Sequence, residues 1–175
     1  MNFTIRQEEK RDYPAVHTLI EQAFKDIPES DHREQFLVER LRQSPAFIPE
    51  LSLVAELGTE IIGQVILSKV EIVADHSTPS LGMAPLSVLP NHQKSGIGTA
   101  LIREAHQRAI RLGYHSVVLL GHPDYYTRFG YRKASTYGIC FPFDAPDECC
   151  MVAELIPNGL NNVHGTVQYA QVFYE

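Results

Sequence analysis

The segment at residues 93–99 contains the residue types best suited to bind a ligand. Gly96 and Gly98 stand one residue apart, and a helical pattern starts directly behind them. A glycine turn can bring backbone N–H groups together, and the unpaired N–H groups and the dipole of a helix start attract an anion. Lys94 adds a positive charge and Ser95 a hydroxyl. The segment therefore predicts a site for a phosphate or a pyrophosphate.

Two common phosphate-binding motifs do not match this segment. The dinucleotide fingerprint requires a third glycine three residues after the second, and that position is Leu101. The P-loop places four residues between its first glycine and a Gly-Lys-Ser/Thr run, and the chain contains no such run. A glycine pair that serves only the geometry of the turn stays an alternative.

The composition is that of an ordinary globular chain. The sequence has 175 residues, of which 44% are hydrophobic and 21% charged, and this mixture argues against extensive disorder. At about 150 residues per domain, the length predicts one domain. The formal net charge of −6 removes any general attraction to nucleic acid. The apolar runs are shorter than the ~20 residues that span a membrane, so we expect neither a nucleic-acid nor a membrane partner.

The cysteines and the first residues favour a reducing compartment. Cys140, Cys149 and Cys150 are too few for a disulfide framework, and the adjacent pair cannot easily bond to itself. Residues 1–6 show no basic stretch followed by an apolar one, as a secretory signal would. We therefore expect a cytoplasmic protein.

Hydrophobic periodicity predicts the order of the elements that position the glycine turn. Strands are expected at residues 2–6, 51–57, 61–72, 81–88, 117–120, 139–143, 151–155 and 167–173. Helices are expected at residues 12–24 with Asp12 as N-cap, from Asp31 with Glu34 completing a capping box, at 97–112, and at 123–129. A β-α-β crossover between residues 86 and 120 requires a parallel pair in an otherwise antiparallel pattern. The fold class is therefore α/β (α+β), with a mixed sheet of about seven strands flanked by helices.

Two segments resemble the Gcn5-related N-acetyltransferase (GNAT) superfamily. In that family a strand with an apolar-x-Val-x-Pro ending precedes Arg/Gln-x-x-Gly-x-Gly/Ala, and here Leu86–Pro90 precedes Gln93–Gly98. The second family signature is a Tyr four residues before a Gly-Phe pair. Here Tyr126 stands four residues before Gly130, and Tyr131 replaces the usual Phe.

The resemblance covers residues 3–143. Residues 121–131 and the tail also look like the bacterial YhbS-like predicted acetyltransferases. The resemblance implies a single domain at 1–175, with an N-acetyltransferase core at 3–143. A strand-rich C-terminal extension at 144–175 is expected to pack on that core.

The resemblance also implies a GNAT fold. An enzyme of this family uses acetyl-CoA as its co-substrate and is expected to need no metal. Acetyl-CoA is expected in a wedge where the strand at Leu86–Val88 splays from its parallel partner at Val117–Leu120. A backbone N–H there would polarise the thioester carbonyl. The amine would attack directly, without a covalent acyl-enzyme. The residues expected to bind acetyl-CoA are Leu86, Ser87, Val88, Gln93, Lys94, Ser95, Gly96, Ile97, Gly98 and Thr99.

Tyr126 occupies the position where many family members place a general acid. An unperturbed Tyr has a pKa of ~10, so its phenol is protonated at neutral pH and can donate to a departing thiolate. A ring that only packs on the pantetheine arm is the alternative. The neighbouring Tyr125 is expected to be structural.

A general base is not identified. Family members often use a Glu on or near the strand at residues 81–88, and this segment has no carboxylate. His122, which could act as a base, and Ser87, which could order a water, are alternatives, although a histidine that satisfies a turn is the favoured interpretation. Structural or solvated roles are expected for the residues that lack metal-ligand spacing, which are His92, His106, His115, Cys149 and Cys150.

The sequence does not decide which amine accepts the acetyl group. Polyamines, amino sugars, antibiotics, amino acids and protein N-termini are all consistent with it. In the family the first two helices and their loop wall the acceptor pocket. Candidate lining residues there are Phe24, His32 and Phe36, with core packing expected for the two aromatics. A late loop contains the acidic residues Asp144, Asp147 and Glu148. This loop either attracts a cationic amine or is simply solvated. A non-catalytic coenzyme A-binding sensor is the alternative function, and a homodimer stays open.

Overall fold

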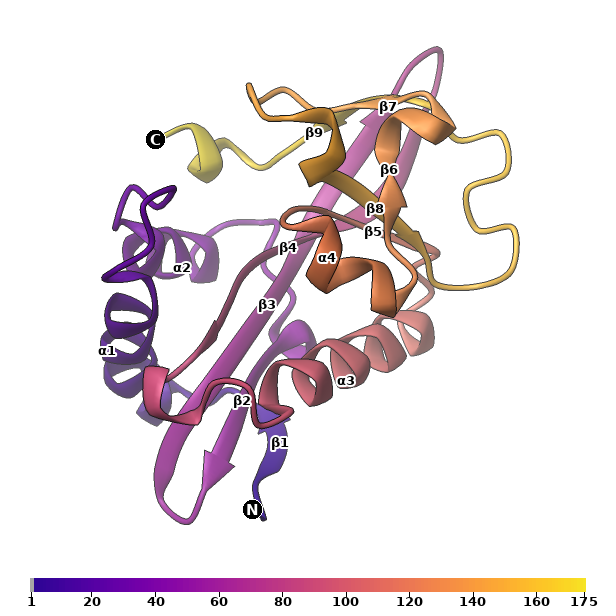
Figure 1. The fold of residues 1–175 in the computed structure, drawn as a ribbon. Coiled ribbons are helices and arrows are strands. Elements are labelled where there is room, and N and C mark those ends of the chain that lie inside the picture. Colours follow the sequence, from indigo (N-terminus) through magenta and orange to yellow (C-terminus); the bar gives the residue numbers. More distant parts are fainter. Residues whose placement is uncertain (1) are drawn as a thin grey trace. The chain divides into compact units, whose positions relative to one another are not determined.

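The computed structural model describes residues 2–175, and these residues form a mixed α/β fold (Figure 1). Its helices are α1 (Tyr13–Phe24), α2 (Glu34–Arg42), α3 (Ile97–Arg111) and α4 (Pro123–Tyr126). Its strands are β1 (Thr4–Gln7), β2 (Ser52–Leu57), β3 (Glu60–Val73), β4 (Ser77–Val88), β5 (Ser116–Leu120), β6 (Arg132–Lys133), β7 (Ile139–Cys140), β8 (Cys150–Glu154) and β9 (Gly165–Gln168). None of the helices in this described part is long and apolar enough to cross a membrane.

The described residues divide into two compact units. The first unit consists of residues 2–67 and 84–105, and the second consists of residues 68–83 and 106–175. Three elements are divided between the units, with one end in the first unit and the other end in the second. These elements are β3, β4 and α3. The strands are hydrogen-bonded in the order β1-β2-β3-β4-β5-β8-β6, and β9 pairs with β3 and β7. The predicted mixed sheet is therefore confirmed.

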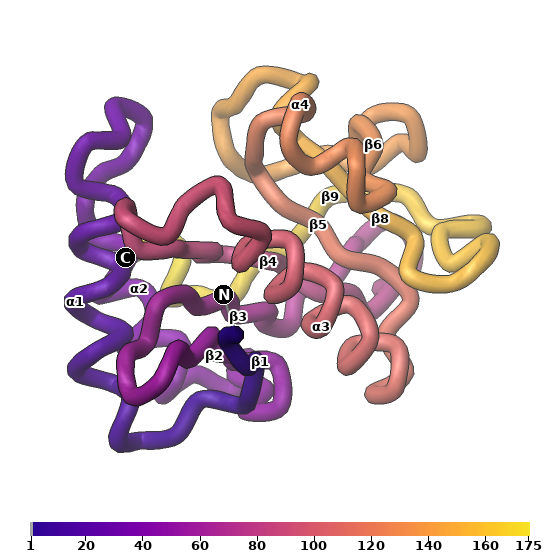
Figure 2. The backbone as a smooth tube through the Cα atoms, turned by 60° about the horizontal axis from the view of Figure 1, so that its bottom comes forward, coloured from indigo at the N-terminus to yellow at the C-terminus, as the bar shows by residue number. Residues whose placement is uncertain are grey.

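The first unit contains an antiparallel β1-β2-β3 arrangement. Ile5 pairs with Ala55 and Leu53 pairs with Val65, and Gly58 has a positive φ of 64° at the β2–β3 turn. The predicted hairpin is thus confirmed. Helices α1 and α2 of this unit lie side by side (Figure 2).

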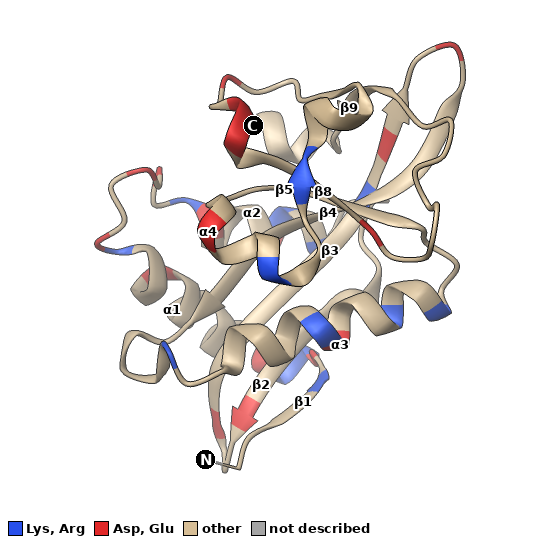
Figure 3. Cartoon of the chain, turned by 45° about the vertical axis from the view of Figure 1, so that its right-hand side comes forward, with Lys and Arg blue, Asp and Glu red and all other residues tan. Residues whose placement is uncertain are grey.

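Helix α3 has the predicted length and apolar face. The periodicity predicts residues 97–112, and the helix ends one residue earlier, before Gly113 with its φ of 91°. Leu101, Ala105 and Ala109 are fully buried. Basic residues appear along the rest of the helix (Figure 3), so its polar face is the exposed one.

The Asp12 side chain does not cap α1 as predicted. Its carboxylate accepts hydrogen bonds from Arg6 Nη1 at 2.7 Å and from the Glu9 N–H at 2.7 Å. Arg6 also bonds Glu56 at 3.1 Å. The hydrogen bond from Arg6 lowers the pKa of Asp12. The Asp12 carboxylate, which was predicted to cap α1, therefore binds the nearby Arg6 guanidinium instead.

The prediction that α2 starts at Asp31 is wrong, because the helix starts at Glu34. Asp31 Oδ1 instead accepts the N–H of Arg33 at 2.9 Å, which makes a local turn. Ser30 Oγ bonds the Glu34 carboxylate at 2.5 Å, so this carboxylate is not reaching back to Asp31. His32 between them has a φ of 60°, which a helix does not allow.

The second unit contains the predicted parallel pair. Leu81 pairs with Val117 and Gly82 with Val118 in the parallel β4–β5 ladder. Strand β8 continues the sheet antiparallel to β5, and Val118 faces Val152 across that ladder. A second parallel pair, β7–β9, was not predicted. The core of this unit consists of Val70, Ile72, Val118, Ala134, Ile139, Val152, Leu160 and Val167.

Several predicted boundaries are inaccurate, most of them in the last third of the chain. The strand predicted at residues 81–88 already begins at Ser77. The predicted strand at residues 167–173 ends at Gln168, and a 3-10 turn follows at Gln171–Tyr174. Strand β7 has only two of the five predicted residues. Strand β6, at Arg132–Lys133, was missed because two residues show no periodicity.

Candidate active site

The glycine turn in the first unit has the backbone conformation of an anion site. Lys94 has a φ of 63° and Gly96 a φ of 88°, and α3 starts at Ile97. A Cβ added at Gly96 would meet no heavy atom within 4 Å, so the surface of the turn is clear. The Ala100 N–H bonds the Gly96 carbonyl at 3.0 Å. The N–H groups of Ile97, Gly98 and Thr99 precede that bond, and α-helical geometry gives such groups no acceptor within the helix.

Side chains within the turn hold it in place. The Ser95 hydroxyl donates to the carbonyl of His92. Gln93 Nε2 donates to the carbonyl of Val88 at 3.2 Å, which ties the turn to the end of β4. The side chains of residues 93–95 are exposed, whereas Ile97 is buried and can offer a ligand only its backbone. A pyrophosphate fits this donor set, because it would meet N–H groups, a lysine and a helix start.

The end of β4 presents alternate backbone groups to its two sides. The Leu89 N–H bonds the Ile62 carbonyl of β3 at 2.9 Å. The Ser87 carbonyl also lies on that side, 3.4 Å from a Cβ built on Gly63. Backbone groups alternate along a strand, so Leu86 and Val88 direct theirs away from β3. Of the three β4 residues predicted to bind acetyl-CoA, these two have available backbone groups, and Ser87 offers its hydroxyl.

Gln64, which was not among the predicted site residues, lies beside Ser87. Gln64 Nε2 donates to Ser87 Oγ at 2.9 Å, and the side chains are both buried, with 2% and 3% of each residue exposed. A polar residue within the apolar run at residues 61–67 was the available signal. Such a residue needs a partner when it is buried.

Tyr126, in the second unit, lies in an aromatic cluster at the C-terminus of α4. Its ring centroid is 4.9 Å from that of Tyr125 and 5.8 Å from that of Tyr131, both in edge-on contact. A Cβ on Gly121 would lie 2.4 Å from the Tyr126 ring, so only glycine allows this approach. Burial raises the pKa of Tyr126 above its ordinary value. Its phenol is therefore a proton donor and not a phenolate.

The aromatic cluster continues to His106, for which a structural or solvated role is expected from the sequence. His106 Nε2 lies 2.7 Å from the hydroxyl of Tyr131, which is 1% exposed. Burial lowers the pKa of His106 to about 4, so the imidazole is neutral. One ring nitrogen of a neutral imidazole accepts, and the Tyr131 hydroxyl can donate to it.

The two alternatives for a base occupy different surroundings. The His122 side chain is exposed, and its carbonyl accepts the N–H groups of Tyr125 and Tyr126, each at 3.1 Å, at the start of α4. The Ser87 hydroxyl is buried against Gln64. A hydroxyl does not accept a proton near neutral pH, so Ser87 can only orient another group.

The candidate acceptor residues are mostly exposed. The expectation that Phe36 packs in the core is wrong, because 41% of it is exposed, and its ring centroid lies 5.5 Å from that of His17 in an edge-on contact. Phe24 is half-buried and His32 exposed. The acidic residues Asp144, Asp147 and Glu148 are exposed. Asp147 accepts from Ser135 at 3.1 Å.

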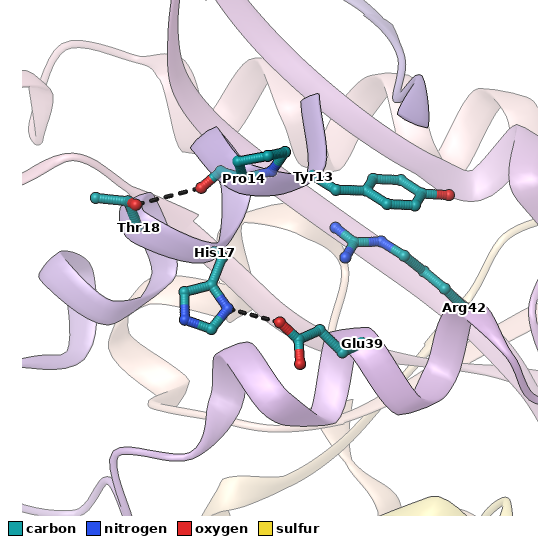
Figure 4. A pocket seen from close by; sticks show the side chains of 6 residues that line it. All are labelled: Tyr13, Pro14, His17, Thr18, Glu39 and Arg42. Atoms are coloured by element: carbon teal, nitrogen blue, oxygen red, sulfur yellow. Dashed lines mark hydrogen bonds and ion pairs between the residues drawn. The ribbon is translucent and has the colours of Figure 1, made fainter. Parts of the chain in front are cut away.

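A surface cavity of about 480 Å³ lies between α1 and α2 (Figure 4). His17 Nδ1 lies 2.8 Å from Glu39 Oε1 across the two helices. The Arg42 guanidinium lies 3.8 Å from the centre of the Tyr13 ring. The His17, Glu39 and Arg42 side chains of this cavity thus already have partners within the chain. Among the described residues, no cluster of three or more His, Cys, Asp or Glu side chains could hold a metal ion.

Comparisons with known proteins agree with one another. The family model described as an acetyltransferase (GNAT) domain matches residues 49–133. The chain is similar to the uncharacterized N-acetyltransferase YhbS of Escherichia coli, at 31% identity over 169 residues, covering 97% of both chains. It is 29% identical to the uncharacterized N-acetyltransferase YjhQ of Escherichia coli over 159 residues, covering 88% of this chain and 85% of YjhQ.

Two solved structures resemble the chain over nearly all its length. One is Escherichia coli YhbS in complex with CoA, with a TM-score of 0.90, 30% identity and coverage of 100% of this chain and 93% of that one. The other is a GNAT family acetyltransferase from Brucella melitensis in complex with acetyl-CoA, with a TM-score of 0.81 and 30% identity. The second match covers 98% of both chains.

Proposed function

Because the chain belongs to the GNAT family of N-acetyltransferases, we propose that it transfers an acetyl group from acetyl-CoA to a primary amine by direct attack of the amine. The observation that carries this proposal is the turn at Lys94–Gly96, whose clear surface lies before the unpaired N–H groups of α3. The CoA and acetyl-CoA complexes of the two similar structures support coenzyme A as the ligand of that turn.

The turn would hold the pyrophosphate of the coenzyme. The N–H groups of Ile97, Gly98 and Thr99 would donate to it, and Lys94 would neutralise part of its charge. Gln93 and Ser95 would act mainly by fixing the turn, since their side chains bond the Val88 and His92 carbonyls. The backbone of Leu86 and Val88 would bind the pantetheine arm.

Tyr126 would serve as the general acid. The bound coenzyme supplies a thioester, whose sulfur must gain a proton as the acetyl group leaves. Tyr126 keeps its phenolic proton at neutral pH because burial raises its pKa, so the proton is present when the thiolate departs. Tyr125 would support the ring of Tyr126 from its edge.

The amine must lose a proton, and we assign that step to solvent. Residues 81–88 contain no carboxylate, and the exposed His122 is an alternative acceptor. The absence of a carboxylate favours a second candidate, a coenzyme A-binding sensor without turnover.

We also propose that the protein is cytoplasmic and forms one domain. In it, the extension at residues 144–175 would contribute β8 and β9 to the core of residues 3–143.

The first test is a thermal shift with acetyl-CoA, with NAD and ATP as controls. At 100 times its dissociation constant, a ligand stabilises by ~2.7 kcal/mol, which raises the Tm of a chain of this size by a few degrees. A rise with acetyl-CoA alone supports the proposal. No rise at saturating acetyl-CoA contradicts it, and an equal rise with NAD or ATP indicates a general nucleotide site.

The second test measures release of the CoA thiol with a panel of primary amines. The panel comprises spermidine, glucosamine, an aminoglycoside, lysine and a peptide with a free N-terminus. Release with any of them above the rate without amine supports acetyl transfer. Binding of acetyl-CoA without release across all acceptor classes supports the sensor instead.

A further inference from the structure

Gln64 makes two hydrogen bonds to one short stretch of β4. Its Nε2 donates to Ser87 Oγ at 2.9 Å and to the Pro85 carbonyl at 3.2 Å. An amide NH₂ group has two hydrogens, and both are used here. The three residues are buried, so solvent does not compete for these bonds. Gln64 therefore fixes β4 at two positions, one on either side of Leu86.

The neighbouring Gly63 allows β3 to approach closely in the same place. A Cβ on Gly63 would lie 2.8 Å from Ile97 Cγ2 and 3.4 Å from the Ser87 carbonyl oxygen. Side chains of successive strand residues point to opposite faces, so Gln64 lies on the face opposite to α3. Strand β3 is thus packed against α3 at Gly63 on one face, and Gln64 holds the end of β4 from the other face.

Between Pro85 and Leu89, the backbone groups of Leu86 and Val88 are the ones directed away from β3, and the Val88 carbonyl already accepts from Gln93 at 3.2 Å. The N–H groups of Leu86 and Val88 are then the donors available to a ligand on that side. A donor that stabilises developing negative charge must be held in place before the reaction. Gln64 is the side chain that holds this stretch at two points.

We propose that Gln64 is a positioning residue for acetyl transfer, which fixes Pro85–Ser87 so that a backbone N–H of Leu86 or Val88 polarises the thioester carbonyl. This inference rests on the proposed function. The turn at residues 93–99 supplies most of the affinity for the coenzyme, and β4 supplies polarisation. Loss of the Gln64 hydrogen bonds should therefore change the bound thioester more than it changes binding.

The experiment records the carbonyl stretch of [1-¹³C]acetyl-CoA bound to the full chain by isotope-edited infrared spectroscopy. We expect the wild-type protein to lower the stretch relative to free acetyl-CoA. Gln64→Met has a similar length and no amide hydrogens, and it should remove at least half of that shift while the Kd rises less than threefold. The matched control is Ser68→Ala, a fully buried residue of the same strand whose hydroxyl has no hydrogen-bond partner in the structure. It should retain the wild-type shift.

A second variant covers the case in which Gln64→Met does not fold. In Gln64→Glu an ionised carboxylate cannot donate to the Pro85 carbonyl, whereas a protonated one can, so the shift should increase as the pH is lowered. An unchanged shift in Gln64→Met, a pH-independent wild-type shift in Gln64→Glu, or an equal loss in Ser68→Ala would overturn the inference. The same holds for a wild-type protein that binds acetyl-CoA without any shift. A wild-type protein that does not bind acetyl-CoA overturns the proposed function itself.

Discussion

His106 and Tyr131 form a partly buried hydrogen bond, with Nε2 of His106 2.7 Å from the Tyr131 hydroxyl. His106 comes from the middle of α3, and Tyr131 directly follows the positive-φ residue Gly130. The Tyr131 ring also contacts the edge of the Tyr126 ring at 5.8 Å. The histidine thus fixes the residue that supports the proposed general acid, without touching the acid itself.

We predict that this pair makes the protein less stable in mild acid. Burial lowers the pKa of His106 from 6.5 to about 4 in the folded state, so the unfolded chain binds the proton more readily. The contribution of His106 to the free energy of unfolding is fully present above pH 6.5. It is lost as the pH falls toward 4, by up to about 3 kcal/mol. Urea unfolding at pH 7.5, 6 and 5 measures this slope. His106→Gln should flatten the slope, and an unchanged slope in that variant would assign the effect to other groups.

The Arg6 guanidinium is predicted to stabilise the first unit. It bonds Asp12 and Glu56, and only 6% of the Asp12 side chain is exposed. Arg6→Met leaves the Asp12 carboxylate buried without its cation, and we expect a loss of about 3 kcal/mol in the free energy of unfolding. The matched control is Arg11→Met, which removes a pair with 69% and 55% exposed side chains and should cost less than about 1 kcal/mol. Equal losses in the two variants would contradict the role of burial.

The sequence predicted those elements whose pattern is long enough to show a period. Helix α3 was placed to within one residue because its apolar face recurs over four turns. The β2–β3 hairpin was placed by two apolar runs around Gly58. Strand β6 has two residues, and its pairing with β8 depends on residues distant in the chain. No local pattern could have revealed it.

The candidate site was predictable where the backbone determines it. The conformation at Gly96 follows from a glycine placed directly before a helix. By contrast, lysine rarely adopts a positive φ, so nothing in the sequence predicts the positive φ of Lys94. The partners of Gln64 and His106 are also tertiary contacts, 23 and 25 residues away. A buried polar residue can be recognised in a sequence, but its partner depends on the fold.

Gly96→Val is predicted to weaken acetyl-CoA binding at least tenfold. A β-branched residue is strained at a φ of 88°, and its side chain would occupy the clear surface of the turn. The matched control is Gly113→Val, at the other end of α3. Its φ is 91° and it also has no heavy atom within 4 Å of a Cβ, so it carries the same strain. Calorimetric titration should show a normal Kd for Gly113→Val. Normal binding by Gly96→Val as well would mean that the turn does not hold the coenzyme.

Tyr126→Phe is predicted to lower kcat at least tenfold while the Kd for acetyl-CoA stays within a few-fold. The ring keeps its contacts with Tyr125 and Tyr131, and only the hydroxyl that donates the proton is lost. The measurement is release of the CoA thiol, with the amine found in the acceptor screen, together with calorimetric titration.

Tyr125→Phe is the control, because it removes a hydroxyl from the adjacent residue on the same short helix. A general acid at Tyr126 requires kcat to fall in Tyr126→Phe and to stay near the wild-type value in Tyr125→Phe. If the Tyr126 ring only packs on the pantetheine arm, Tyr126→Phe keeps its turnover, since phenylalanine fills the same space. If both variants lose activity equally, the loss is not specific to the Tyr126 hydroxyl, which contradicts its role as the general acid. The split between kcat and Kd therefore separates proton transfer from support of the ligand.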